Sequence, residues 1–220
     1  MMSDDLAIMR ICDDFGFRHA FIPAQLGHEH LPPLLLLHGT GGDERDLLPV
    51  GARLSPGAAI LSPRGRISEN GMPRFFRRLA EGVFDEADLR AQTQALADFI
   101  AQARASYGLG APVAVGFSNG ANIAASLLWS TPDSLAAAAL WRVMRPLPEP
   151  PSGGLAGKPV LVLAGAADPL IPAAQSQALA QLLDEAGARV TLEILPAGHG
   201  LTASDLAITQ RFLADLPRGG

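Results

Sequence analysis

The feature that most constrains the fold is a short apolar run that ends in Gly-x-Ser-x-Gly and passes at once into a helical pattern. Residues 112–115 have the pattern of a strand, the motif is Gly116-Phe117-Ser118-Asn119-Gly120, and residues 119–129 have an alanine-rich helical pattern. A tight turn between strand and helix exposes the serine hydroxyl and places the next backbone N–H beside it. Glycine suits both flanking positions because side chains there would crowd the crossing of strand and helix. The motif alone also fits a glycine-rich turn whose serine has no catalytic role. Its interpretation therefore depends on whether the chain supplies a base and an acid for the serine.

Strands alternate with helices along most of the chain. Short apolar runs are typical of strands covered on both faces, and they occur at residues 34–37, 58–61, 112–115, 135–143, 160–163 and 190–195. Helical spacing occurs at residues 85–105, 119–129, 173–186 and 202–216, with Asp85 as a candidate N-cap and Gly108 just beyond the end of the first. The alternation predicts an α/β fold with a doubly wound, mostly parallel sheet flanked by helices.

The chain length suits one domain. At 220 residues it is long enough for a single well-buried α/β unit. We therefore expect a single domain over residues 1–220, with residues 1–14 as a poorly ordered or peripheral segment and residues 15–23 as an extended edge segment.

A base and an orienting acid for Ser118 should follow later strands, because functional groups of doubly wound sheets gather at the carboxyl ends of the strands. His199 follows the run at 190–195 between two glycines, whereas the other histidines, His19, His28, His30 and His38, all precede the serine. Asp168 follows the run at 160–163. Its rivals follow a helix or lie in helical patterns, and they are Asp133, Asp184 and Asp205. The predicted catalytic residues are therefore Ser118, Asp168 and His199, in the chain order Ser…Asp…His.

An oxyanion hole needs two backbone donors. One is the N–H of Asn119, the residue after the nucleophile, and the other should come from the loop after the early strand, where we assign the N–H of Thr40. A glycine-rich loop of this kind could also cradle a phosphate, but this one lacks both nucleotide-binding glycine spacings.

Four ordered motifs, spread over residues 17–216, resemble the phospholipase/carboxylesterase branch of the α/β-hydrolases. They are Leu37-His38-Gly39-Thr40-Gly41-Gly42, Gly116-Phe117-Ser118-Asn119-Gly120, Ala164-Gly165-Ala166-Ala167-Asp168-Pro169-Leu170-Ile171-Pro172 and Gly198-His199-Gly200. Asn119 departs from the glutamine common in that branch. The resemblance implies a serine esterase that cleaves carboxylic esters or thioesters of small acyl substrates through an acyl-enzyme, without metal or cofactor.

The substrate site should be open, because only a proline-rich loop at residues 146–154 stands where larger α/β-hydrolases insert a cap domain. Residues 70–76 fall where relatives carry an aromatic segment along the substrate cleft. Phe75 and Phe76 could form an apolar wall or simply pack in the core. Arg74, beside Arg77 and Arg78, could bind an anionic group of the substrate or belong to a solvated face. His28-Glu29-His30 has metal-binding residue types but no further ligands nearby, so we expect no metal site.

Charge and composition limit the partners. The net charge of −5 and pI near 5.5 argue against nucleic-acid binding and favour a small-molecule ester substrate. The one cysteine, Cys12, excludes an intramolecular disulfide. The N-terminus lacks the pattern of a signal peptide and no apolar run is long enough to span a bilayer, so we expect a cytoplasmic protein. The sequence leaves open whether the protein forms a homodimer.

Two other functions remain open. One is a non-catalytic binding module on the same fold. The other is a peptidase or a hydrolase of carbon–carbon bonds, because fold and triad do not fix the scissile bond.

Overall fold

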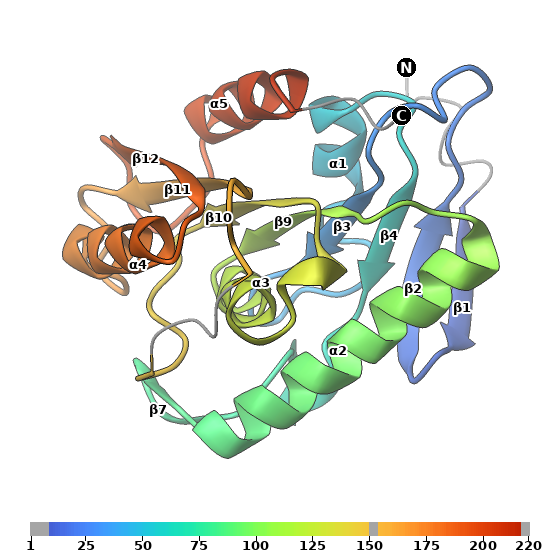
Figure 1. Ribbon diagram of the computed structural model, residues 1–220. Helices are drawn as coiled ribbons and strands as arrows, with labels where there is room; N and C mark the ends of the chain where they lie inside the picture. The colour runs from blue at the N-terminus through green and yellow to red at the C-terminus, as the bar shows by residue number, and fades with distance from the viewer. Residues whose placement is uncertain (1–8, 150–153, 217–220) are drawn as a thin grey trace.

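The computed structural model describes residues 9–149 and 154–216, and its centre is an eight-stranded sheet (Figure 1). In spatial order the strands are β1 (Arg10–Asp14), β2 (Phe17–Ile22), β4 (Ile60–Pro63), β3 (Leu34–Leu37), β9 (Val113–Phe117), β10 (Ala137–Trp141), β11 (Pro159–Gly165) and β12 (Arg189–Leu195). The pairs β1–β2 and β2–β4 are antiparallel and all the others are parallel. The predicted mostly parallel sheet is confirmed.

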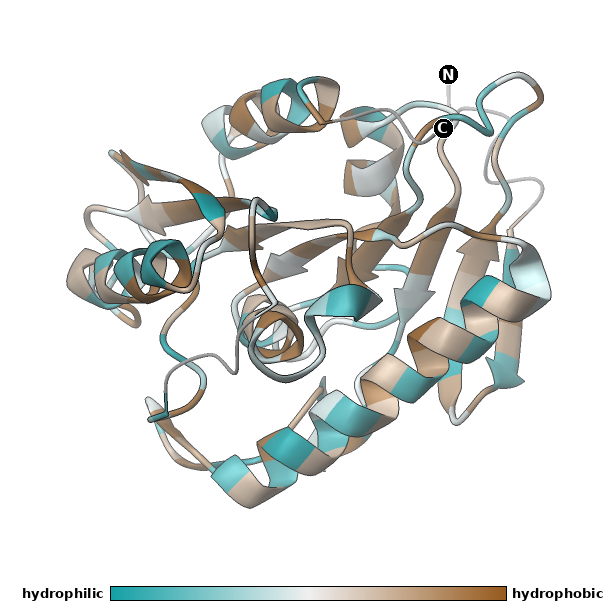
Figure 2. Ribbon diagram, viewed as in Figure 1, coloured by the Kyte–Doolittle hydropathy of each residue, from teal (hydrophilic) through white to brown (hydrophobic). Residues whose placement is uncertain are grey.

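Helices cover both faces of the sheet. On one face lie α1 (Leu48–Leu54) and α5 (Ala203–Ala214), and on the other α2 (Glu86–Tyr107), α3 (Asn119–Ser130) and α4 (Ala173–Glu185) (Figure 1). A short 3-10 turn, Pro132–Ser134, follows α3. Each face has its own apolar core, one around Phe99 and Leu127 and the other around Leu36 and Trp141. Figure 2 shows hydrophobic sheet strands and helices with mixed faces, as expected where a helix turns its apolar stripe inward.

Local chemistry explains the ends of the longest helix. The side chain of Asp85 accepts a hydrogen bond from the N–H of Asp88, so Asp85 is the N-cap. Gly108 ends α2 with φ of +67°, a conformation that favours glycine. Both termini agree with the sequence prediction.

Several elements differ from the sequence prediction. Within the expected peripheral segment 1–14, residues 10–14 form the edge strand β1, and residues 1–8 lie outside the described part of the chain. Helix α1 was not predicted because its 7 residues make it the shortest α-helix of the described chain and it contains Gly51, a poor helix former. Gly51 lets the helix lie close to β3, since a Cβ there would lie 2.7 Å from Leu36 Cδ1 and the leucine side chain would have to shift. Two hairpins were also missed, β5 (Ile67–Glu69) with β6 (Met72–Arg74), and β7 (Arg78–Ala80) with β8 (Val83–Phe84).

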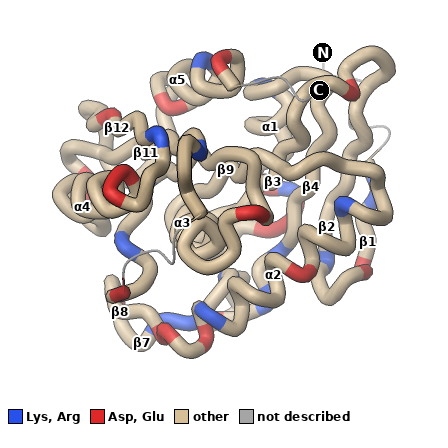
Figure 3. The backbone as a smooth tube through the Cα atoms, viewed as in Figure 1, with Lys and Arg blue, Asp and Glu red and all other residues tan. Residues whose placement is uncertain are grey.

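The chain between β10 and β11 is too short to form a cap domain. It spans residues 142–158, and the described residues of this stretch form no helix or strand. Residues 150–153 of the predicted proline-rich loop lie outside the described part. None of the helices in residues 9–149 and 154–216 is both long and apolar enough to cross a membrane. Charged residues of both signs are spread over the molecule (Figure 3).

Candidate active site

Ser118 lies in a strained turn between β9 and α3. Its φ is +52°, a region that a serine seldom adopts, so the surrounding structure must hold it there. The two glycines of the motif allow the crossing. A Cβ at Gly116 would lie 2.6 Å from Gly120 O, and one at Gly120 would lie 2.0 Å from Leu37 O. The structure therefore supports the geometric reasoning that singled out this motif.

The residues predicted as base and acid come together with Ser118 in one hydrogen-bonded chain. His199 Nε2 lies 3.0 Å from Ser118 Oγ, and His199 Nδ1 lies 2.8 Å from Asp168 Oδ2. The three residues follow β9, β11 and β12, so the carboxyl ends of these parallel strands bring them together. The ring of His199 also packs against Phe117, with ring centroids 5.3 Å apart.

Asp168 is held as a carboxylate. Its side chain is fully buried, which opposes ionisation, but hydrogen bonds from the N–H of Ile171, from His199 and from the N–H of Leu170 outweigh burial and lower the pKa of Asp168. The two N–H groups reach Oδ1, at 2.8 Å from Leu170 and 3.0 Å from Ile171. Oδ2 is therefore left for His199, which fixes the orientation of the imidazole.

The two predicted oxyanion donors, Thr40 and Asn119, border the same cavity as Ser118. Within the described part of the chain, neither backbone N–H donates to a protein acceptor. The side chain of Asn119 has a separate task, since its Oδ1 accepts the N–H of Phe75 at 2.7 Å. Both residues therefore stand beside the cavity with a backbone N–H that no described protein group engages.

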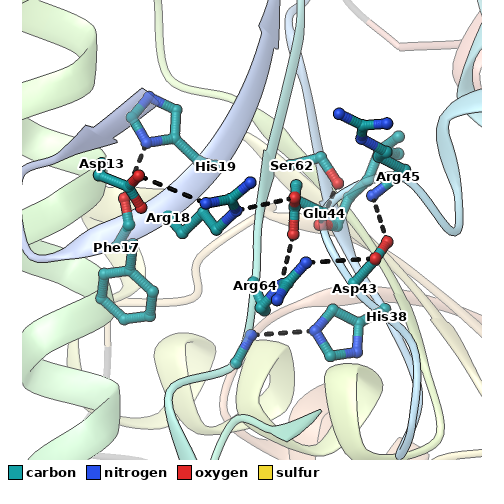
Figure 4. A network of polar contacts seen from close by, with 12 residues as sticks. Asp13, Phe17, Arg18, His19, His38, Asp43, Glu44, Arg45, Ser62 and Arg64 are labelled. Atoms are coloured by element: carbon teal, nitrogen blue, oxygen red, sulfur yellow. Dashed lines mark hydrogen bonds and ion pairs between the residues drawn. The ribbon is translucent and has the colours of Figure 1, made fainter. Parts of the chain in front are cut away.

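A polar network ties the loop that carries Thr40 to the neighbouring strands (Figure 4). The buried Glu44 accepts from Arg18 Nε at 3.1 Å and Arg64 Nε at 2.5 Å. Burial opposes ionisation of Glu44, but the hydrogen bonds from these two arginines outweigh it and lower its pKa. Arg18 belongs to β2 and Arg64 follows β4, so the loop is anchored on two strands.

His38, in the same loop, is a neutral structural group. Its Nε2 accepts the N–H of Gly65 at 2.9 Å, so its proton is on Nδ1, which donates to Gly39 O at 2.6 Å. Burial lowers the pKa of His38, in keeping with this neutral form.

A cavity of about 300 Å³ adjoins Ser118 and His199. Its apolar lining comes from four separate parts of the chain, namely Phe84, Phe117, Met144, Leu170 and Ile171. None of these residues was predicted to line the cavity. Three of them lie within the recognised motifs, namely Phe117, Leu170 and Ile171, so their sequence positions already indicated that they lie near Ser118. By contrast, Phe84 and Met144 reach the cavity only through the tertiary fold.

The predicted aromatic wall of Phe75 and Phe76 is corrected. Both side chains are almost fully buried in the core, and neither lines the cavity. Phe75 packs on the ring of His38 with centroids 4.7 Å apart, and Phe76 packs edge-on against Phe84 at 4.9 Å. Phe84 is therefore the aromatic residue of this region that lines the cavity, and Phe76 packs against it from the core.

The arginine cluster divides. Arg74 and Arg78 line the cavity, and both pair with Glu69, at 3.2 Å and 2.9 Å. The hydrogen bond from Arg78, together with the charge of Arg74, lowers the pKa of Glu69, so this side chain is ionised at neutral pH. Arg74 also donates to Thr40 Oγ1 at 2.8 Å. Arg77 is mostly exposed and pairs with Asp85 at the start of α2, outside the cavity lining.

Other candidate groups lie elsewhere. Asp205 pairs with Arg142, not with His199. Among the described residues, no group of three or more His, Cys, Asp or Glu side chains is placed to hold a metal ion, and His28 and His30 belong to none.

Known proteins of similar sequence and structure agree with this fold. The model of the dienelactone hydrolase family matches residues 71–211. MhqD of Bacillus subtilis (strain 168), provisionally named a hydrolase, is 48% identical over 171 residues, which cover 77% of this chain and 86% of MhqD.

Solved structures are similar over nearly the whole chain. A Bacillus cereus carboxylesterase is 41% identical with a TM-score of 0.90, covering 97% of this chain and 100% of the other. A Mesorhizobium loti carboxylesterase is 34% identical with a TM-score of 0.87, covering 94% and 99%. These likenesses confirm the α/β-hydrolase fold expected from the motifs, and the chain belongs to the dienelactone hydrolase family.

Proposed function

We propose that this protein is a serine carboxylesterase that acts on small acyl esters. The observation that carries the proposal is the continuous chain of hydrogen bonds from Ser118 through His199 to Asp168, at 3.0 Å and 2.8 Å, beside a cavity of about 300 Å³. Relatives named as carboxylesterases that cover nearly the whole chain support the same activity.

In the proposed reaction, Ser118 Oγ attacks the ester carbonyl carbon while His199 Nε2 takes the hydroxyl proton. Asp168 holds the imidazole in the tautomer whose Nε2 can accept that proton, and stabilises the imidazolium that forms. The carbonyl oxygen becomes an oxyanion that receives hydrogen bonds from the N–H groups of Thr40 and Asn119.

Collapse of this intermediate breaks the bond to the leaving alcohol and leaves an acyl group on Ser118. The alcohol oxygen receives the proton that His199 took from the serine hydroxyl. Water then attacks the acyl-enzyme with His199 as base, which releases the acid and restores the serine hydroxyl. The strained backbone at Ser118 keeps its hydroxyl at the cavity throughout this cycle.

The test compares wild type with Ser118→Ala on short p-nitrophenyl esters, together with labelling by a fluorophosphonate probe. Ser126→Ala is the matched control, because Ser126 lies on α3 but is buried against Thr93 Oγ1 at 2.8 Å. Ser118→Ala should lose labelling and turnover, and Ser126→Ala should keep both. If wild type shows neither labelling nor turnover, a non-catalytic binding module would be favoured.

The scissile bond is tested by a panel of acyl esters, thioesters, lactones and peptide amides. We expect acyl esters to react faster than peptide amides, because an alkoxide or phenoxide is expelled more easily than an amide nitrogen, and the panel decides between esters and thioesters. A peptidase would instead prefer the amides.

A second candidate, hydrolysis of esters that carry a carboxylate, follows from Arg74 and Arg78 in the cavity lining. One structural relative, YahD, is 27% identical and is described with malic acid. In this candidate, Arg74 would bind the anionic group in competition with Glu69. Arg74→Ala should then reduce turnover of anionic esters much more than of neutral esters, and equal losses on both would refute it.

A further inference from the structure

A fully buried ion pair lies next to the loop that carries His199. Arg142 directly follows β10, Asp205 lies in the first turn of α5, and neither side chain is exposed. Nη1 of Arg142 donates to Asp205 Oδ1 at 2.7 Å, and Nη2 donates to Oδ2 at 3.0 Å. Burying two charges is costly and gives no assured stability, so this pair needs a reason other than packing.

The guanidinium also reaches the carbonyl groups on both sides of His199. Nε of Arg142 donates to Gly198 O at 2.9 Å, and Nη2 donates to Gly200 O at 3.0 Å. One rigid, planar group therefore holds the backbone immediately before and immediately after the imidazole. A guanidinium can do this because its donors point in fixed directions within one plane.

The His199 loop needs such a support. Glycine has the greatest backbone freedom of all residues, and His199 stands between two of them. The side chain of His199 must nevertheless meet two partners at once, Ser118 Oγ at 3.0 Å and Asp168 Oδ2 at 2.8 Å.

The backbone at Arg142 is itself held in an unusual conformation. Its φ is +55°, and its N–H donates to Leu163 O at 2.9 Å, on the neighbouring strand β11. A long side chain seldom adopts a positive φ, and such strain persists where the surroundings enforce it, often at functional sites.

Asp205 fixes the other end of the loop. Its Oδ2 accepts from the N–H of Thr202 at 2.7 Å and from Thr202 Oγ1 at 2.8 Å, which caps α5 where the loop enters the helix. The carboxylate thus holds both Arg142 and the exit of the loop.

We propose that Arg142, held in place by Asp205, is a positioning residue that sets the backbone of residues 198–200 so that His199 reaches Ser118 and Asp168 together. This inference rests on the proposed function, since it assigns the ion pair a task in catalysis. It predicts that loosening the Arg142–Asp205 pair, the clamp of this loop, lowers kcat and leaves KM nearly unchanged. The reason is that neither residue of the clamp borders the substrate cavity.

The test uses two clamp variants and one control. Arg142→Lys keeps a positive charge opposite Asp205 but cannot reach both carbonyl groups with a planar fork. The double variant Arg142→Met, Asp205→Asn removes both charges, so it leaves no unpaired buried charge. The amide oxygen of the new asparagine can still accept the hydrogen bonds from Thr202. Thr209→Val is the matched control. It removes the buried hydrogen bond from Trp141 Nε1 (3.0 Å) between the same strand and the same helix, and the one that Thr209 Oγ1 donates to Asp205 O (2.8 Å), but it leaves the Asp205 carboxylate and its bonds to Arg142 and Thr202 in place.

Each variant is measured for thermal unfolding, for kcat and KM on a short p-nitrophenyl ester well below its unfolding temperature, and for the far-downfield proton resonance of His199 Nδ1–H. Both clamp variants should lose kcat by about 10- to 100-fold with KM within about 3-fold, and the resonance should weaken or shift. Thr209→Val should unfold at a lower temperature but keep kcat and the resonance.

A folded clamp variant with the kcat and resonance of wild type would overturn the inference and leave the proposed function intact. If Thr209→Val lost as much kcat as the clamp variants, the effect would be one of general stability, which would also overturn it. Full turnover by Ser118→Ala would instead refute the proposed function, so the two failures are distinguishable.

Discussion

Replacing Asp168 by asparagine should disable His199 while leaving it in place. An asparagine offers one acceptor oxygen where aspartate offers two, and three donors compete for it: the N–H groups of Leu170 and Ile171 and Nδ1–H of His199. Two of these donors converge on Oδ1. The amide oxygen should therefore stay there, because the reverse orientation would leave two backbone donors facing an NH₂ group at about 1–3 kcal/mol each.

In this orientation the NH₂ group of the new asparagine faces His199 Nδ1, which must then be unprotonated to accept a hydrogen bond. The imidazole proton moves to Nε2, so His199 donates to Ser118 and can no longer take its proton. We expect kcat to fall by about 10⁴-fold, equivalent to about 5 kcal/mol in the activation barrier, the loss associated with the wrong tautomer in a serine triad.

The assay is the steady-state hydrolysis of a short p-nitrophenyl ester at neutral pH, with circular dichroism to confirm folding. Asp184→Asn is the matched control, since Asp184 is an exposed residue on α4, away from the cavity lining. It should behave as wild type. A folded Asp168→Asn protein with kcat within about 10-fold of wild type would refute the tautomer argument.

Gly120→Ala should destabilise the fold by about 1–3 kcal/mol or more in urea unfolding, because its Cβ would lie 2.0 Å from Leu37 O; wild-type stability would contradict this. Ser118→Gly should be inactive yet more stable than Ser118→Ala by about 1 kcal/mol in the same assay, because φ is +52° there. Asp168 has a pKa below its unfolded value, so it contributes stability that is present above the unfolded pKa and is lost as pH falls through the folded pKa. Stability measured against pH should therefore fall less steeply on the acid side in Asp168→Asn than in wild type, and parallel curves would count against this.

Local pattern was enough to predict the sheet and three side chains that lie together at one edge of it. Residues 34–37 form a strand with the predicted bounds, because four consecutive leucines buried on both faces leave little choice. Ser118, Asp168 and His199 were found because each follows an apolar strand run, and parallel strands deliver their carboxyl ends to one edge.

The missed features depend on contacts between distant parts of the chain. Phe75 and Phe84 are both phenylalanines in one loop-rich region, and only the tertiary fold decides that Phe75 packs on His38 whereas Phe84 lines the cavity. Arg142 is the sharper case. An arginine near the end of an apolar run has the sequence appearance of a surface residue. Its partners, Gly198, Gly200 and Asp205, nevertheless lie more than fifty residues further along the chain.

Arg142 and Asp168 are proposed to act through the same imidazole, so their effects should not add. Once the wrong tautomer has removed His199 as a base, a looser loop has little catalysis left to remove. The double variant Asp168→Asn, Arg142→Lys should therefore have nearly the kcat of Asp168→Asn alone. This kcat is well above the value expected if the fold-losses of the two single variants multiplied. Arg142→Lys should likewise have no further effect on the residual hydrolysis of Ser118→Ala. Full additivity in these cycles, measured on one p-nitrophenyl ester, would mean that Arg142 influences turnover by a route that bypasses His199.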